Sequence, residues 1–197
     1  MYDGRRRSRP EIGHLHETDA ELLRRAQRGD DEAFHQLVDR HAGGLFKLAF
    51  ALVGNAADAE DVMQETFLGA LKTIRGFERR SSVKTWLCRI LSKRAARCHR
   101  TKRRHAAVPM ENDTERTVAT GRKGGIPTSD AVDARLDMTE MIGALSAEHR
   151  EVVVLRELEG MSYAEIAEVL NVPIGTVESR LYRARQELRS RLEGYLT

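Results

Sequence analysis

Aromatic residues and cysteines are scarce in this chain of 197 residues. Aromatic residues make up 5% of the sequence, so any hydrophobic core must be built mainly from aliphatic side chains. The two cysteines, Cys88 and Cys98, fall on one predicted helix and are separated by about 15 Å along its axis. That separation is too large for a disulfide bond, which indicates free thiols and a reducing, cytoplasmic location.

Long apolar runs are also absent. No stretch of about 18 consecutive apolar residues occurs, which argues against a membrane-spanning helix. The N-terminal segment 1–16 is rich in arginine but lacks the apolar stretch of a secretion signal. We therefore expect this segment to be a disordered basic arm.

Sequence motifs of common enzyme classes are missing as well. There is no P-loop, no G-x-S-x-G, no H-E-x-x-H and no dinucleotide-binding fingerprint. The adjacent pair Cys98-His99 supplies two metal-binding groups, whereas a structural zinc site needs four at recognisable spacing. The sequence therefore predicts no catalytic residues, no metal site and no cofactor.

The most informative segment that is present spans residues 160–188. Ser162 and Glu165 have the spacing of a capping box, which predicts a helix that starts at Tyr163. The sequence Asn171-Val172-Pro173 should end that helix, and a second one should begin at 174–176. Positions expected to face inward on the second helix are Val177, Leu181, Ala184 and Leu188, and those expected to face outward are Glu178, Ser179, Arg180 and Arg183. The pattern predicts a helix-turn-helix whose second helix can lie in a DNA major groove.

Helical patterns also account for the rest of the ordered chain. Three further helices are expected between Thr18 and about Arg75, the first of them starting at a capping box formed by Thr18 and Glu21. A fourth is expected to start at 82–84 and to continue past Arg94. No segment alternates with the period of a strand. We predict an all-α fold with two small helical domains, 17–105 and 132–195, joined by a flexible linker at 106–131 that is rich in glycine and proline.

Positive charge is concentrated in one interval. Between Glu78 and Glu111 there is no acidic residue, and the interval carries Arg79, Arg80, Lys84, Arg89, Lys93, Arg94, Arg97, Arg100, Lys102, Arg103 and Arg104. Such a helix repels itself unless an anion lies against it, and a nucleic-acid backbone is the natural anion. The alternative is a solvated basic face. Trp86 lies within this interval, and it either stacks on an unpaired base or packs in the core beside Leu87 and Ile90.

Acidic residues gather on the preceding helix. Asp58, Asp61 and Glu65 share one face, with Glu60 and Gln64 beside it, whereas Val62, Met63, Leu71 and Ile74 are expected to face the core. This face is either a docking surface for a basic protein or a solvated surface. Metal-dependent phosphoryl chemistry is a poorer interpretation, because no histidine, lysine or glycine-rich loop accompanies the carboxylates.

Taken in order, these segments resemble the extracytoplasmic-function (ECF) sigma factors of bacterial RNA polymerase. AEDVMQETF at 59–67 is similar to the core-binding helix of sigma region 2, and FERRSSVKTWLCRI at 77–90 is similar to its promoter-melting segment. Residues 145–188 are similar to sigma region 4. Many regulators share such a helix-turn-helix, but both regions in this order with a linker between them are specific to the family.

The resemblance implies a transcription initiation factor that binds core RNA polymerase at the clamp of the largest subunit, opens promoter DNA and is held by an anti-sigma factor. The implied core-binding residues are Asp58, Glu60, Asp61, Gln64 and Glu65. The implied contacts to the −10 element are Arg79, Arg80, Ser81, Ser82, Lys84, Trp86, Arg89, Lys93 and Arg97. The implied contacts to the −35 element are Thr176, Glu178, Ser179, Arg180, Tyr182 and Arg183.

Two other functions remain open from the sequence. A helix-turn-helix regulator that never binds core polymerase would use residues 160–188 alone, and would need neither the acidic nor the basic helix. An enzyme acting on nucleic acid would use the carboxylates of 58–65 as metal ligands, and magnesium-dependent cleavage would reveal it.

Overall fold

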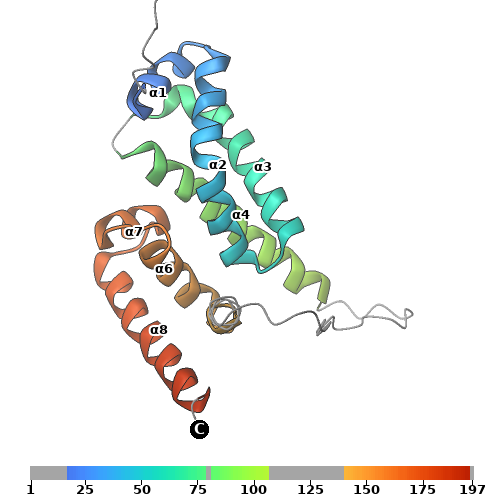
Figure 1. Cartoon of the computed structure of the whole chain (residues 1–197), viewed down its shortest axis with the longest axis vertical. Helices are drawn as coiled ribbons and strands as arrows, with labels where there is room; N and C mark the ends of the chain where they lie inside the picture. The colour runs from blue at the N-terminus through green and yellow to red at the C-terminus, as the bar shows by residue number, and fades with distance from the viewer. Residues whose placement is uncertain (1–16, 79–80, 107–139, 196–197) are drawn as a thin grey trace, which may run out of the picture.

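The computed structural model describes residues 17–78, 81–106 and 140–195, and all regular secondary structure in these ranges is helical (Figure 1). The predicted all-α class is therefore confirmed. The helices are α1 (Asp19–Gln27), α2 (Asp31–Val53), α3 (Ala56–Thr73), the 3₁₀ turn η1 (Ile74–Gly76), α4 (Val83–Ala106), α6 (Ala147–Glu157), α7 (Tyr163–Leu170) and α8 (Ile174–Tyr195). The predicted N-terminal arm and all of the predicted linker except Ala106 lie outside the described residues.

Short polar side chains fix where the helices begin. The hydroxyl of Thr18 accepts the backbone N–H of Glu21, and the carboxylate of Glu21 accepts the backbone N–H of Thr18, so the predicted capping box is present. Asp30 caps α2 by accepting the backbone N–H of Ala33, and Asn55 caps α3 by accepting the backbone N–H of Asp58. Between α2 and α3, Gly54 adopts a φ of 84°, a left-handed conformation that side chains with a Cβ rarely adopt.

Helices α1–α4 pack around an aliphatic core, as the scarcity of aromatic residues predicted. Leu22, Leu48 and Leu91 come from three different helices, and none of them has any exposed surface. Gly69 lets α3 approach α4 closely, because a Cβ at this position would lie 3.3 Å from the Cγ2 atom of Ile90. This close approach brings the acidic helix α3 directly beside the basic helix α4.

The prediction for the inner face of α3 is wrong at Leu71. Its side chain is 48% exposed, whereas Val62, Thr66, Gly69 and Ala70 are buried. Leu71 follows Ala70, and one helical step of about 100° turns it out of the buried stripe. Helix α3 also ends slightly earlier than predicted, at Thr73, and the chain continues as η1.

The C-terminal domain forms the predicted helix-turn-helix. Ser162 and Glu165 make the reciprocal capping box that starts α7, and Asn171 ends it with a left-handed φ of 54°. Val177, Leu181 and Ala184 of α8 are buried, and α8 packs against α6 and α7. Figure 1 shows α8 extending away from the N-terminal domain.

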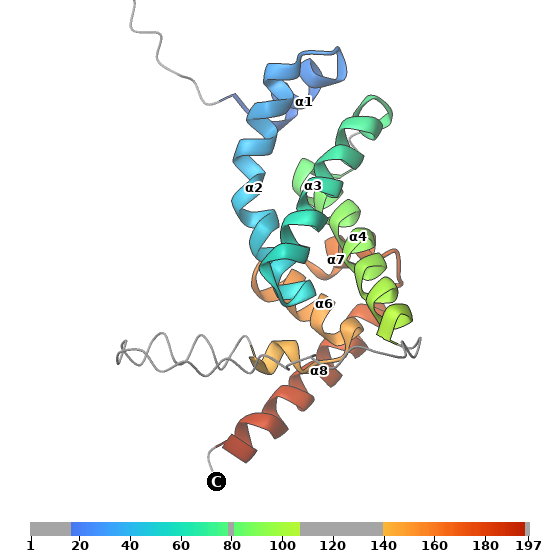
Figure 2. The ribbon, with the colours of Figure 1, turned by 90° about the vertical axis from the view of Figure 1, so that its right-hand side faces the viewer.

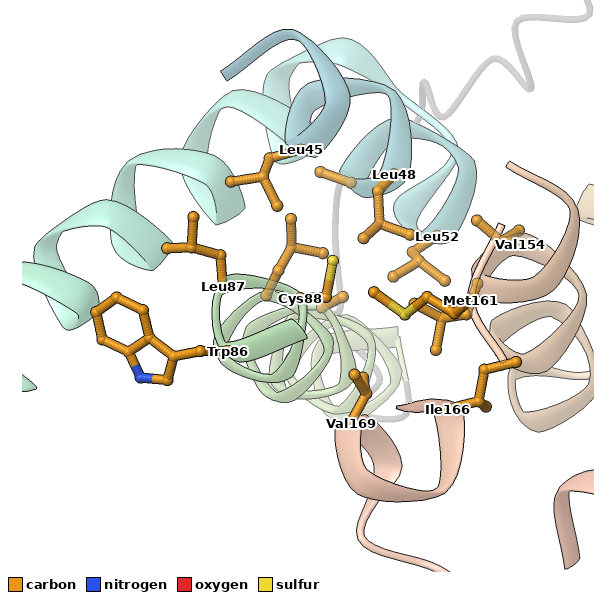
Figure 3. Packing of buried hydrophobic residues seen from close by; sticks show 14 of the residues in the cluster. Leu45, Leu48, Leu52, Trp86, Leu87, Cys88, Val154, Met161, Ile166 and Val169 are labelled. Carbon is orange, nitrogen blue, oxygen red and sulfur yellow. The ribbon is translucent and has the colours of Figure 1, made fainter. Parts of the chain in front are cut away.

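The two helical domains pack against each other, which the sequence had not indicated. Helix α7 lies on α4 and α6 lies on the end of α2 (Figure 2). Met161, in the turn before α7, extends toward Cys88 and Leu52, and Val169 points at α4 (Figure 3). All four side chains are less than 5% exposed, so apolar burial supports the contact.

Candidate functional site

Some carboxylates of α3 lie in the groove between α3 and α4, and the others lie on the outer surface of the helix. Asp58 pairs with Lys102 and Glu65 pairs with Arg94, both across the groove between α3 and α4. The ammonium group of Lys102 is the main cause of a lowered pKa at Asp58, opposed by partial burial. The groove, about 370 Å³ in volume, is also lined by Asp61. Two of the predicted core-binding carboxylates are thus already engaged within the domain.

The outer surface of α3 combines polar and apolar side chains. Glu60, Asp61 and Gln64 are exposed, and so are Leu68 (57%) and Leu71 (48%). Positions 61, 64, 68 and 71 follow helical spacing and therefore share one face. The sequence interpretation missed both leucines, although continuing the i+3 and i+4 spacing beyond Gln64 would have found them. Exposed leucines within a polar rim are typical of a protein-docking surface.

The basic face of α4 is partly open to solvent. Lys93 and Arg97 are exposed, whereas Arg94 turns toward α3. Arg79 and Arg80 lie outside the described residues. The open cations form a row that can lie along a phosphate backbone.

At the N-terminal end of α4, Ser82 and Trp86 are both fixed by local contacts. The hydroxyl of Ser82 accepts the backbone N–H of Thr85 at 3.0 Å, which caps the helix. Trp86 is 8% exposed and stacks on Phe77, with ring centroids 4.6 Å apart and an interplanar angle of 23°. Trp86 is therefore mainly a core residue.

An open hollow of about 460 Å³ lies beside this aromatic pair. Its walls come from Thr73, Gly76, Phe77, Glu78, Ser81, Trp86 and Arg89 of the N-terminal domain, and from Glu168 of α7. An aromatic floor, a hydroxyl group and a cation at the rim are the groups that receive an unstacked base. The predicted residues Ser81, Trp86 and Arg89 therefore meet at one place.

Two cations of α4 are held by the C-terminal domain. The ammonium group of Lys84 lies 2.9 Å from the carboxylate of Glu159 and donates to its backbone carbonyl at 2.8 Å. The guanidinium of Arg89 donates to the Glu168 carboxylate at 2.6 Å and to its carbonyl at 3.2 Å. These contacts join residues about 75–79 positions apart in the sequence.

The outward surface of α8 carries most of the predicted groove-reading residues. Glu178, Ser179, Tyr182 and Arg183 are exposed, and Tyr182 is 66% exposed. Thr176 is half-buried, and its carbonyl accepts the hydroxyl of Ser179. Arg180 differs from its expected outward position, because its guanidinium turns back to Glu148 at 2.7 Å and its side chain is only 22% exposed.

Neither cysteine forms a disulfide, and the surroundings of both thiols raise their pKa, which disfavours the reactive thiolate. Burial raises the pKa of Cys88 to about 12, so its thiol stays protonated at neutral pH. His99 lies 2.9 Å from the carbonyl oxygen of Leu52. Among the described residues, no group of three or more His, Cys, Asp or Glu side chains is arranged to hold a metal ion.

Both halves of the chain match sigma-factor family models. Residues 37–105 match sigma-70 region 2 and residues 135–188 match sigma-70 region 4. The ECF RNA polymerase sigma factor SigW of Bacillus subtilis is 31% identical over 176 residues, which cover 86% of this chain and 94% of SigW. This chain belongs to the ECF sigma factors.

Other relatives of this sigma factor agree. The RNA polymerase sigma-H factor of Pseudomonas aeruginosa is 33% identical over 191 residues, which cover 91% of this chain and 96% of that protein. As a sigma factor, the chain binds core RNA polymerase and directs the initiation of transcription.

Solved structures of similar proteins include two complexes with partner proteins. CnrH in complex with the cytosolic domain of CnrY matches with a TM-score of 0.68 and 28% identity, covering 90% of this chain and 99% of CnrH. RpoE of Bartonella quintana in complex with the anti-sigma factor NepR matches with a TM-score of 0.63 and 28% identity, covering 81% and 96%. No helix in the described ranges is both long and apolar enough to span a membrane.

Proposed function

We propose that the two domains, 17–105 and 132–195, divide the work of this sigma factor. The N-terminal domain docks on core polymerase through α3 and holds the −10 element along α4, while α8 reads the −35 element. The observation that carries the proposal is the placement of a mixed apolar and acidic face on α3 beside a cationic face on α4. One small rigid domain can thereby contact protein on one side and DNA on the other.

Docking on core polymerase is assigned to the outer face of α3. Leu68 and Leu71 would supply the apolar centre, with Glu60, Asp61 and Gln64 around it. Asp58 and Glu65, which pair with cations of α4, would act by fixing the angle between the two helices. The partner surface should be basic at its rim and apolar at its centre.

The −10 element is assigned to α4 and the hollow at its N-terminal end. Lys84, Arg89, Lys93 and Arg97 would neutralise phosphates, and the hollow beside Trp86 would receive an unstacked base. Arg79, Arg80, Ser81 and Ser82 belong to the same predicted surface. Unstacking a base costs a few kcal/mol, which stacking and phosphate contacts must offset.

The −35 element is assigned to α8. Glu178 can accept from cytosine N4, Arg183 can contact guanine or a phosphate, and Tyr182 presents its ring to the groove. Thr176, Ser179 and Arg180 complete the predicted surface, although Arg180 must leave Glu148 to reach DNA. The protein is further proposed to work in the cytoplasm without catalytic residues or a cofactor, and to be held by an anti-sigma factor.

Transcription from purified core polymerase tests this proposal. Core enzyme plus the full chain should give a promoter-dependent run-off transcript, with start sites first mapped in cells that overproduce the protein. The double variant Asp61→Ala, Leu71→Ala should bind core polymerase about tenfold more weakly, because it removes a central contact and a rim contact. Asp39→Asn, which removes an exposed carboxylate from α2, is the matched control and should bind normally.

The same experiments separate the sigma function from its alternative. A regulator that does not bind core polymerase would bind duplex DNA tightly alone and show no affinity for core enzyme. That outcome, or equal core binding by the α3 variant and its control, would reject the assignment of α3.

A further inference from the structure

A second groove between α3 and α4 lies next to the one beside Asp58, and Arg94 and Arg97 line both. Its volume is about 420 Å³, and its uncharged lining residues are Gly69, Thr73 and Ile90. Every charged residue that lines it is basic: Lys72 of α3, and Lys93, Arg94, Arg97 and Arg100 of α4. We call this site the cationic groove.

Most of the basic side chains around the cationic groove have no anionic partner. Arg94 lies 3.3 Å from the carboxylate of Glu65. The other four are exposed, and none of them makes an ion pair or a side-chain hydrogen bond with any residue that the structure describes. Like charges that crowd around one groove repel each other, so a bound anion would stabilise the arrangement.

The sign of the charge changes along α3. Its carboxylates Asp58, Asp61 and Glu65 line the neighbouring groove, whereas Lys72, near the other end of the helix, is its only basic residue. An anionic ligand would be repelled from the acidic end of α3 and attracted to the end that carries Lys72. The cationic groove is therefore the part of the surface between α3 and α4 that suits an anion.

The cationic groove adjoins the hollow beside Trp86, because Thr73 lines both. Arg89 at the rim of the hollow and Lys93 in the groove are four residues apart, so they lie on the same side of α4. Between Trp86 and Arg100, α4 rises by about 21 Å, which is the length of about six stacked nucleotides at about 3.4 Å each. A strand that places an unstacked base in the hollow can therefore continue into the groove.

The length of the basic face favours a strand over a small phosphate compound. Exposed cations follow one another along α4 at spacings of four, three and four residues, at Lys93, Arg97, Arg100 and Arg104. Residues at these spacings share one face of a helix. Arg104 lies beyond the lining of the groove. A compound with a few phosphates would leave that last cation unused, whereas a strand can contact the whole row.

We infer that the cationic groove binds the phosphate backbone of the −10 strand, with Lys72 and Arg100 as phosphate contacts in addition to Lys93 and Arg97. The inference rests on the proposed function, because it extends the surface assigned to the −10 element. It gives α3 two roles, since its outer face docks on core polymerase while Lys72 holds DNA. Phosphate contacts position a strand without reading its sequence, so promoters with different −10 sequences should depend on them equally.

The salt dependence of DNA binding by the holoenzyme is the first test. Core polymerase saturated with the full chain binds a mapped promoter whose −10 region is already unpaired, and the association constant is measured over a range of KCl concentrations. Each lost phosphate contact makes the slope of log K against log salt shallower by about 0.7 for a single strand and about 0.9 for a duplex. The groove variant Lys72→Gln, Arg100→Gln should therefore be shallower by about 1.4 to 1.8.

Arg28→Gln, Lys47→Gln is the matched control for the groove variant. Arg28 follows α1 and Lys47 lies in α2, both are exposed, and their loss causes the same change in net charge of the same domain. The control should keep the slope of the unchanged protein. Equal slopes for the groove variant and this control would overturn the inference.

Uncharged phosphates provide the second test, which locates the contact. Single methylphosphonate groups replace each phosphate of the −10 region in turn. At the phosphate that Lys72 contacts, the neutral group should weaken binding by the unchanged protein but should not weaken binding by Lys72→Gln any further, because that contact is already lost. A scan that finds no such position would contradict the role of Lys72.

Core binding and a third variant separate failure of this inference from failure of the proposed function. The groove variant should bind core polymerase as tightly as the unchanged protein. If it binds core more weakly and keeps its salt slope, Lys72 belongs to the docking surface and the inference is wrong. Lys93→Gln, Arg97→Gln should make the slope shallower by a similar amount. If only this variant does so, the inference fails and the proposed −10 surface stands. If neither variant does so, the −10 surface on α4 is wrong as well.

Discussion

The guanidinium of Arg150 in α6 donates a hydrogen bond of 3.0 Å to the backbone carbonyl of Leu52, in the last turn of α2. The same side chain donates to the carbonyls of Ile142, Gly143 and Leu145 in the segment before α6. Carbonyls in the last turn of a helix have no N–H group within that helix to donate to them, so they need a donor from elsewhere. Arg150 therefore connects the two domains and also orders the entry to α6.

Replacing Arg150 by alanine should lower the free energy of unfolding by about 2–4 kcal/mol. The variant removes one donor from four carbonyls at once. The Leu52 carbonyl keeps the His99 ring nitrogen and the Ile142 carbonyl keeps the backbone N–H of Leu145, but the carbonyls of Gly143 and Leu145 lose the guanidinium, and an unpaired group in a partly buried site costs about 1–3 kcal/mol. Lysine should rescue only part of the loss, because its ammonium cannot reach carbonyls arranged around a planar guanidinium. Urea unfolding measures the change.

Arg189→Ala is the control for that prediction. Arg189 is exposed on α8, and its removal causes the same change in net charge. The control should lie within about 0.5 kcal/mol of the unchanged protein. An Arg150→Ala variant as stable as this control would show that water satisfies the four carbonyls equally well.

Trp86→Ala should destabilise the N-terminal domain by about 3–5 kcal/mol. Trp86 is 8% exposed and stacks on Phe77, so truncation leaves a cavity and removes an aromatic contact. Trp86→Phe should recover most of this loss, since it keeps a ring against Phe77. Guanidinium unfolding followed by circular dichroism measures both variants.

Binding to single-stranded DNA separates the structural role of Trp86 from its proposed role in DNA binding. If Trp86 serves only to fill the core, the folded variant Trp86→Phe should bind DNA as well as the unchanged protein. If Trp86→Phe restores stability but leaves DNA binding reduced, the exposed edge of the indole contacts a base. Equal stability of Trp86→Ala and the unchanged protein would contradict the packing described for this ring.

Local signals explain which features the sequence could predict. The capping boxes at Thr18 and Ser162 involve residues three positions apart, so the pattern of side chains is sufficient to place the helix starts. The buried face of α8 follows from helical periodicity in the same way. The error at Leu71 came from treating an apolar residue as an inward one, although one helical step separates it from the buried Ala70.

Features that depend on distant residues could not be predicted. Glu159 and Glu168 stand in the sequence as ordinary surface carboxylates, and their contacts with Lys84 and Arg89 depend on how α7 lies on α4. Arg180 likewise looked like an outward residue, because only the packing of α6 against α8 brings Glu148 within 2.7 Å of it. Periodicity gives the face on which a residue lies but not the element that covers that face.

Glu151 should make the contact between the domains sensitive to pH. Its carboxyl lines a small cavity between α4 and α6, and burial there raises the pKa of Glu151 above its usual value of 4.5. The Ser92 hydroxyl opposes this shift but makes no hydrogen bond of good geometry within the described residues. The charged or titratable groups around Glu151 are His99 of α4, Glu148 and Arg150 of α6, and Arg180 of α8.

The direction of the effect follows from this raised pKa. A group whose pKa is higher in the packed state stabilises that state below its ordinary pKa, and the contribution is lost as the pH rises through the raised value. The packed form should therefore weaken as the pH rises from about 4.5, because ionised Glu151 prefers water. Small-angle scattering across this range should show the domains separating.

Glu151→Gln isolates this carboxyl from the other titrating groups. The variant keeps the shape of the side chain without the charge, so it should match the unchanged protein at acid pH and be more compact at neutral pH. Comparing the two proteins at each pH largely cancels the contributions of all other ionisable groups, because both proteins contain them. A difference between the two proteins that stays constant with pH would show that the Glu151 carboxyl does not change its ionisation when the domains pack together.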